Sequence, residues 1–167
     1  MLIRFEESKD HDAVHKVNAA AFESPAEANL VDILRKEASP IVSLVAEEEG
    51  AIAGHILFSP VTLSGNTALI IMGLGPMAVM PKYQKKGIGS ALVKKGLEEC
   101  KELGAGAVIV LGHPWFYPRF GFIPSLRYGF RSEYDVPEDV FMALELQPGY
   151  LQGAAGIIKY HPAFNRV

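Results

Sequence analysis

The sequence has very little cysteine: Cys100 is the only one among its 167 residues. A single thiol excludes an intramolecular disulfide framework and a cysteine-rich zinc site. The chain also lacks any apolar run close to the roughly 18 residues that a membrane span needs. Its first residues, MLIRFEESKD, carry acidic groups where a signal peptide has its apolar core. We therefore expect a cytoplasmic protein that does not insert into a membrane.

Basic residues are not in excess either. Lys and Arg total 16 and Asp and Glu total 19, which gives a net charge of −3. Because proteins that bind nucleic acid usually carry a strongly basic surface, we expect no nucleic-acid partner. Three familiar site patterns are also missing: the G-x-S-x-G motif of hydrolases, the Walker loop, and the dinucleotide fingerprint, whose third glycine would stand at Leu92.

What the chain does have is the composition of a folded domain. Hydrophobic residues make up 49% and charged residues 21% of the sequence. A length of roughly 100–200 residues is typical of one domain, and such a domain buries enough surface to need no covalent staples. We therefore predict a single domain that spans residues 1–167.

The spacing of apolar residues predicts a mixed α/β domain with a largely antiparallel sheet of about seven strands and about four helices. Residues 41–80 are expected to form a three-stranded meander, and residues 113–122 a short helix or turn. The predicted strands are 2–6, 41–47, 52–63, 69–79, 107–111, 126–132 and 139–146, and the main helices end near residues 22, 37 and 103.

A polar, basic loop with two glycines, residues 81–89, lies between an apolar strand and a helix. The first backbone N–H groups of a helix are unpaired and attract anions. Gly87 and Gly89 lack the side chains that would keep a phosphate away from this backbone, and Lys85 and Lys86 add positive charge. The same pattern also fits an ordinary solvated loop, and these residues alone do not decide between the two.

Residues 84–89, Gln-Lys-Lys-Gly-Ile-Gly, resemble the Q/R-x-x-G-x-G/A signature of the GNAT superfamily of acyl-CoA-dependent N-acyltransferases. Residues 117–122, Tyr-Pro-Arg-Phe-Gly-Phe, are similar to the Y-x-x-x-G-F segment of that family. The predicted order of elements also matches, so the resemblance covers most of the chain. It implies a twisted sheet splayed between its fourth and fifth strands, with acetyl-CoA as cosubstrate. The implied reaction is acetyl transfer to a primary amine by direct attack in a ternary complex.

Pro76 is unusual inside an apolar strand, because proline removes a donor from the ladder and belongs at edges or bulges. A harmless kink near the end of the strand explains it equally well. The resemblance implies a bulge at this point, followed by residues 77–79 that pair with the pantetheine arm and polarise the thioester carbonyl.

The resemblance also assigns roles to individual residues. The amides of residues 87–90, with Lys85 and Lys86, would hold the pyrophosphate, while Gln84 supports the loop. Tyr117 would be the general acid that protonates the departing thiolate. One position departs from the family pattern, since Val110 replaces an asparagine that many members carry seven residues before the tyrosine. The implied cofactor-binding set is Met77, Ala78, Val79, Gln84, Lys85, Lys86, Gly87, Ile88, Gly89 and Ser90.

Other aromatic and histidine residues are expected to be structural. We expect the rings of Trp115, Phe116, Phe120 and Phe122 in the core, as is usual for aromatic side chains. His55 lies inside a predicted strand. The pair His11 and His15 has a metal-chelating spacing, but no third ligand is evident, and we expect no metal.

The sequence leaves several alternatives open. Glu23, Glu27 and His113 are candidates for the general base, and an ordered water would also serve. The acceptor is a small-molecule or peptide amine, and a homodimer is one candidate assembly. A non-catalytic acyl-CoA-binding or sensing domain would use the same fold. A nucleotide-binding module is a second alternative, in which simple nucleotides would compete without any need for pantetheine.

Overall fold

A mixed sheet runs through the molecule and carries helices on both of its faces. The computed structural model describes the backbone of residues 1–167 and every side chain except that of Thr67. Its strands and α-helices are β1 (Leu2–Phe5), α1 (His11–Phe22), α2 (Ala26–Glu37), β2 (Val42–Glu48), β3 (Ala51–Leu63), β4 (Asn66–Val79), α3 (Ile88–Glu102), β5 (Ala107–Leu111), β6 (Ile123–Pro124), β7 (Phe130–Ser132), β8 (Phe141–Glu145) and β9 (Gly156–Lys159).

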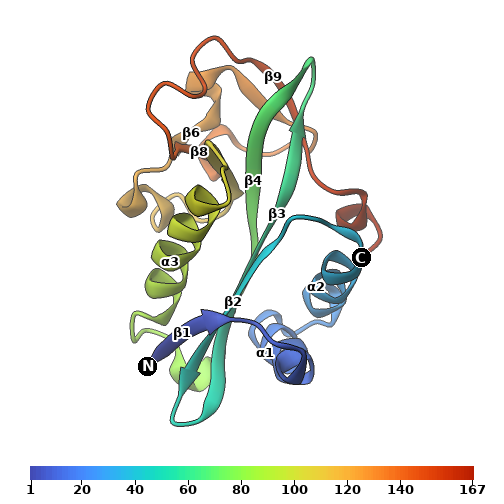
Figure 1. The fold of residues 1–167 in the computed structure, drawn as a ribbon, viewed down its shortest axis with the longest axis vertical. Helices are drawn as coiled ribbons and strands as arrows, with labels where there is room; N and C mark the ends of the chain where they lie inside the picture. Colours follow the sequence, from blue (N-terminus) through green and yellow to red (C-terminus); the bar gives the residue numbers. More distant parts are fainter.

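The strand order in the sheet is β1-β2-β3-β4-β5-β8-β6, and β9 pairs with both β3 and β7. Neighbours are antiparallel except for the pairs β4–β5 and β7–β9, which are parallel. The helix α3 lies on one side of the long strands, and α1 and α2 lie on the other (Figure 1). The predicted α/β class, the mostly antiparallel sheet and the meander of β2, β3 and β4 are therefore confirmed. None of the helices in the described residues has the length and apolar character required to cross a membrane.

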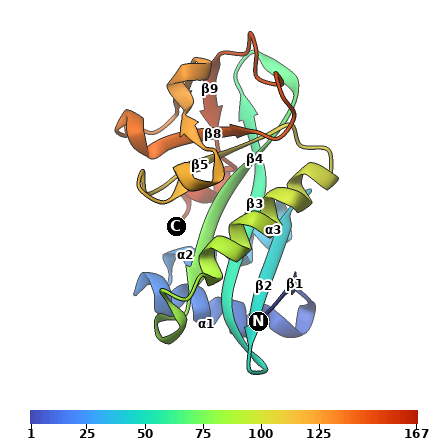
Figure 2. The same cartoon turned by 90° about the vertical axis from the view of Figure 1, so that its left-hand side faces the viewer.

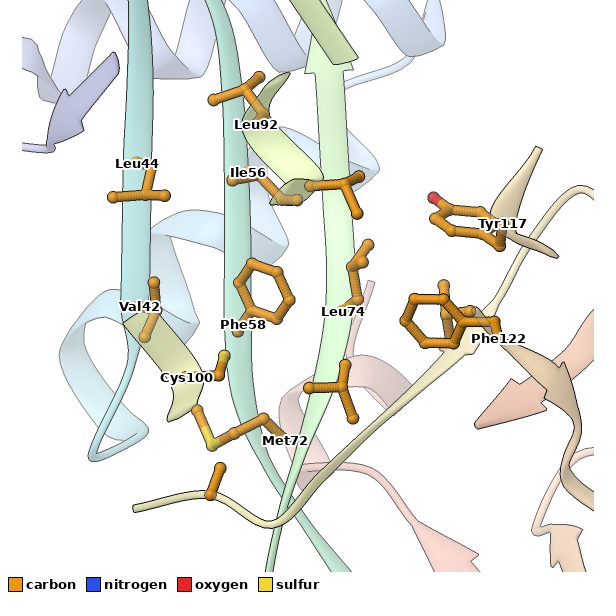
Figure 3. Packing of buried hydrophobic residues seen from close by; sticks show 14 of the residues in the cluster. Val42, Leu44, Ile56, Phe58, Met72, Leu74, Leu92, Cys100, Tyr117 and Phe122 are labelled. Carbon is orange, nitrogen blue, oxygen red and sulfur yellow. The ribbon is translucent and has the colours of Figure 1, made fainter. Parts of the chain in front are cut away.

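The core has two faces because successive side chains of a strand point to opposite sides. Leu44, Ile56 and Phe58 belong to the cluster beneath α3 (Figure 3). Val45 and Leu57 belong to the cluster beneath α1 and α2. Each face thus receives a complete apolar layer from the same two strands.

Close packing of α3 onto the sheet depends on glycine. A Cβ atom placed on Gly96 would overlap the ring of Phe58, and one placed on Gly54 would lie 3.1 Å from Ile88 Cγ2. Because protein interiors have few voids, an added methyl group at either position would push the helix outward. The position of α3, and of the loop that enters it, is therefore set by these contacts.

The short helix or turn predicted within residues 113–122 is confirmed as a 3-10 turn over Tyr117–Phe120, which Gly121 ends at φ +100°. One predicted strand is wrong in detail. Residues 126–132 do not form one strand: a 3-10 turn occupies Ser125–Tyr128, and only Phe130–Ser132 is extended, because Gly129 adopts φ +79° between them. With β6 and β9 added, the described sheet has nine strands, compared with about seven predicted.

The strands β4 and β5 separate partway along their length. They pair only from Ile71 with Ala107 to Leu74 with Val110, whereas β4 continues to Val79. A register shift opposite β3 coincides with residues 75 and 76, which places a bulge at Pro76. Figure 2 shows β4 descending past α3 while β5 remains in the upper half of the molecule. The predicted splay and bulge are therefore present.

Candidate active site

A cavity of about 600 Å³ lies beside the free end of β4, and we call it the basic cavity. Its lining contains Lys85 and Arg119 and, among the described residues, no Asp or Glu. Of the predicted site residues, the cavity brings together Met77, Val79, Gln84, Lys85, Gly87, Ile88, Gly89, Ser90 and Tyr117. The lining therefore has the charge expected of a site for an anion.

Two predicted residues lie outside this lining. Ala78 pairs with His55 on β3, and its side chain is buried. The ammonium group of Lys86 instead lies over the ring of Tyr83, 5.6 Å from the ring centroid. Neither side chain contributes to the wall of the basic cavity.

The loop before α3 leads into the helix so that its first backbone amides have no preceding helical turn to accept their hydrogen bonds. Lys85 and Gly87 both adopt positive φ, at +64° and +85°. The helical ladder starts where the amide of Ala91 donates to the carbonyl of Gly87 at 3.1 Å. The amides of residues 87–90 thus precede the ladder, at the positive end of the helix dipole.

Gly89 is not required by the protein's own packing. A Cβ atom there would lie 3.7 Å from Met77 Cε and 3.9 Å from Phe116 Cζ, which are ordinary contacts. The missing side chain instead leaves room on the cavity side of the helix terminus. Such room allows a phosphate to approach the backbone closely.

Gln84 connects the loop to the sheet. Its Nε2 donates a hydrogen bond of 3.0 Å to the carbonyl oxygen of Val79, the last residue of β4. This is the contact expected of a side chain that supports the loop.

Tyr117 begins the 3-10 turn at the inner end of the basic cavity. Its ring lies edge-on to those of Phe116 and Phe122, with centroid distances of 5.0 and 5.7 Å. Its hydroxyl points toward β4 (Figure 3). Burial raises the pKa of Tyr117 to about 12, so the phenol is protonated at neutral pH. A Cβ atom on Gly112 would overlap this ring, which identifies Gly112 as a positioning glycine that the sequence analysis did not find.

The other aromatic residues of this segment divide into two groups. Phe122 is buried, and Phe116 and Phe120 are partly buried against the core beneath α3. Trp115 is 70% exposed, so the prediction that it lies in the core is wrong. It precedes the 3-10 turn at the rim of the basic cavity and stacks on His113 with a centroid distance of 5.0 Å.

A second cavity, of about 380 Å³, lies on the other side of the β4 bulge, and we call it the aromatic cavity. It shares Met77, His113 and Tyr117 with the basic cavity. Its full lining is Phe22, Glu27, Leu30, Leu74, Gly75, Pro76, Met77, Leu111, Gly112, His113, Tyr117, Tyr134, Tyr160 and Phe164. Tyr117 therefore stands where the two cavities meet.

The structure separates the three side chains suggested as general base. Glu27 and His113 line the aromatic cavity, whereas Glu23 lines neither cavity and is an exposed residue at the end of α1. The aromatic residues that α1 and the C-terminal part of the chain contribute to this cavity were not among the predicted site residues. No local pattern marks these residues, because they come from distant segments.

His55 is fully buried, and burial lowers its pKa to about 4. Its Nδ1 lies 3.2 Å from Asn18 Nδ2, which can only donate, so the neutral ring carries its proton on Nε2. Nε2 then donates to Ser43 Oγ at 2.9 Å, and Ser43 donates to Glu6. These contacts are those of the structural histidine that we predicted.

One histidine of the pair on α1 contacts the neighbouring helix α2. His15 Nδ1 lies 2.8 Å from Asp32 Oδ2 on α2, so this side chain connects the two helices. The described residues contain no group of three or more metal-ligating side chains.

Comparison with known proteins places the chain in a family. Residues 9–122 match the model of the Acetyltransferase (GNAT) family. The uncharacterized N-acetyltransferase YhbS of Escherichia coli strain K12 is 38% identical over 167 residues, which cover 99% of both chains. The uncharacterized N-acetyltransferase YjhQ of the same strain is 36% identical and covers 88% of this chain and 86% of its own.

Solved structures agree with these matches. The crystal structure of Escherichia coli YhbS in complex with CoA has a TM-score of 0.91 and 36% identity, and covers 99% of this chain and 92% of that one. A GNAT family acetyltransferase from Brucella melitensis in complex with acetyl-CoA has a TM-score of 0.81 and 35% identity, with coverage of 98% and 97%. The chain belongs to the Acetyltransferase (GNAT) family.

Proposed function

We propose that this protein transfers an acetyl group from acetyl-CoA to a primary amine by direct attack in a ternary complex. The observation that carries the proposal is the meeting of two cavities at Tyr117. One is lined by cations and a helix N-terminus, and the other contains a carboxylate. The relatives that are solved with CoA and acetyl-CoA support the choice of cosubstrate.

The basic cavity fits coenzyme A chemically. Its lining is free of carboxylates in the described residues, and Gly89 leaves space beside the amides that precede the α3 ladder. We assign the pyrophosphate to the amides of residues 87–90 and to Lys85, with Lys86 contributing charge from outside the lining. The free edge of β4 over residues 77–79 would bind the pantetheine arm and polarise the thioester carbonyl.

Tyr117 supplies the acid of the reaction. The amine nitrogen bonds to the acetyl carbon, the carbon–sulfur bond breaks, and the sulfur takes the phenolic proton. An ammonium substrate gives up two protons in all, solvent restores the phenol, and one proton is released per turnover. Because Glu27 and His113 line the aromatic cavity and Glu23 does not, the first two remain the side-chain candidates for the base.

Amine-dependent release of free thiol tests this proposal. Purified protein with acetyl-CoA and a panel of amines should release coenzyme A, and the rate should depend on the added amine. Binding of acetyl-CoA without any amine-dependent thiol release would identify a non-catalytic acyl-CoA-binding domain. Independence of metal ions and a cytoplasmic location remain predictions, and chelator treatment should leave activity and Tm unchanged.

A further inference from the structure

The aromatic cavity contains one carboxylate and no Lys or Arg among the described side chains that line it. That carboxylate belongs to Glu27, in the first turn of α2. Its Oε2 is buried and has no hydrogen-bond partner among the described residues. Since a buried carboxylate oxygen without a partner is unfavourable, the site calls for a cationic donor from outside the protein.

The walls around Glu27 are apolar and aromatic. The ring of Tyr160 lies between those of Tyr134 and Phe164, at centroid distances of 5.9 and 5.1 Å. Phe22 contributes an exposed ring from the end of α1. Aromatic faces attract both flat apolar groups and cations, so these walls favour the body of an aromatic amine.

The polar groups of the cavity limit what else the ligand carries. The hydroxyl of Tyr134 is already used, because it donates to Asn165 Oδ1 at 2.9 Å. The hydroxyl of Tyr160 is buried without a partner, so it offers one further hydrogen bond. A ligand carboxylate would face Glu27 without a Lys or Arg in the described lining to compensate it, and a second ammonium group would lack a second carboxylate.

Resting on the proposed function, we propose that the acceptor is a small aromatic primary monoamine whose ammonium group binds Glu27. A cavity of about 380 Å³ is within the range of small-molecule sites, roughly 300–1,000 Å³. The amine enters on the side of β4 opposite to the basic cavity and reaches Tyr117 at the shared wall. Glu27 is thus the residue that selects the charge of the acceptor, and the rings select its shape.

Four amines separate this proposal from its alternatives: phenethylamine, phenylalanine, butylamine and spermidine. Phenethylamine should have the highest kcat/KM. Phenylalanine, which adds only a carboxylate to the same body, should be at least 100-fold poorer. Butylamine tests the contribution of the ring, and spermidine the cost of extra ammonium groups. A preference for phenylalanine or spermidine would contradict the proposal and leave acetyl transfer itself intact.

The matched variants are Glu27→Gln and Glu23→Gln. The first should raise KM for phenethylamine at least tenfold and leave the Kd of acetyl-CoA unchanged. The second removes a nearby exposed carboxylate outside the cavity and should change neither value. Phe22→Leu removes an exposed ring of the cavity lining and should reduce the preference for phenethylamine over butylamine.

Calorimetry tests the site even if no amine is acetylated. Phenethylamine should bind the protein in the presence of coenzyme A, and Glu27→Gln should weaken this binding at least tenfold while Glu23→Gln preserves it. Binding that is equal in all three proteins would overturn the assignment of Glu27. Absence of turnover together with Glu27-dependent binding would refute the proposed reaction but not the nature of the ligand.

Discussion

The two cavities that meet at Tyr117 are built in different ways. The lining residues of the basic cavity all come from two segments of the chain, residues 77–90 and 113–119, although not every residue of these segments contributes. The aromatic cavity draws its lining from residues 22–30, 74–77, 111–117, 134 and 160–164. A binding site formed by one strand, loop and helix is recorded locally in the sequence, whereas a site assembled from five segments exists only after the sheet has folded. This difference explains why the cavity proposed for coenzyme A is easier to identify from the sequence than the cavity proposed for the acceptor.

The largest expected effect comes from the residue that both cavities share. Tyr117→Phe keeps the ring and its packing but removes the hydroxyl. Because general acid catalysis typically contributes about 10²–10⁴-fold, kcat should fall by that factor when thiolate departure limits the rate. Steady-state kinetics with the best amine measure this. The Kd of acetyl-CoA should change by well under tenfold, because the lost interaction matters mainly in the transition state.

Tyr117 would instead be a purely structural residue if the folded variant turned over at the parental rate. In that case Tm should drop while activity per folded molecule is retained. Since burial raises the pKa of Tyr117 to about 12, loss of the phenolic proton should not limit kcat at neutral pH.

The second-largest effect is expected in the stability of the elements that hold the cavities in place, not in the residues that line them. α1, which contributes Phe22 to the aromatic cavity, is tied to β2 and β3 by the hydrogen bonds from Asn18 through His55 to Ser43. His55 has a pKa of about 4 in the folded protein and an ordinary value of 6.5 when unfolded. As the pH falls, His55 is therefore protonated in the unfolded chain before it is protonated in the folded protein. The contribution of neutral His55 to the free energy of unfolding is complete above pH 6.5 and declines as the pH falls toward 4.

By linkage, His55 should lower the free energy of unfolding by about 3 kcal/mol between pH 7 and pH 4. Denaturant unfolding at several pH values, compared with His55→Gln, isolates this contribution because all other titratable groups are common to both proteins. Parallel stability curves for the two proteins over this interval would show that His55 is not the responsible group.

A third change should affect the basic cavity alone. Gly89→Val fills the space beside the helix amides and should raise the Kd of acetyl-CoA at least tenfold, about 1.4 kcal/mol. Ala91→Val is the matched control, since it places the same side chain in the same helix outside the cavity lining. Unchanged affinity by calorimetry in a folded Gly89→Val protein would end the assignment of the pyrophosphate. If Gly89→Val altered only the KM for the amine, this would contradict the assignment of a separate substrate to each cavity.

The smallest effect is expected at Lys85. Its charge is exposed and partly screened by salt, so Lys85→Ala should weaken acetyl-CoA binding by less than tenfold. The loss should shrink as the salt concentration is raised, which calorimetry at two ionic strengths measures. Lys82→Ala, in the same loop but outside the lining, should have little effect. A loss that does not depend on salt would indicate a structural role for Lys85.

Much of the fold could be predicted from the sequence, because apolar spacing reports which face of an element is buried. The helix Ala26–Glu37 ends where the sequence predicts, and the strand Ala107–Leu111 has the predicted bounds. The predictions that are wrong concern residues at which short-range sequence signals compete. Residues 126–132 have the apolar content of a strand, but Gly129 divides them, and Trp115 has the character of a core residue but stands at a rim.

For this protein, the sequence by itself determined the local character of the loop that we propose binds the pyrophosphate: the glycines, lysines and glutamine of residues 84–89 act through backbone conformation and local charge, which depend on adjacent residues. Pro76 was likewise visible in the sequence as a proline inside an apolar strand, and Tyr117 as the first position of a family motif. Only the tertiary structure decided that Glu27 faces the same cavity as Tyr117 and that Glu23 does not. It also brought Tyr160 and Phe164 to that cavity from the end of the chain. The physical reason is that these contacts join segments far apart in sequence, and packing on a common sheet, rather than any local preference, brings them together.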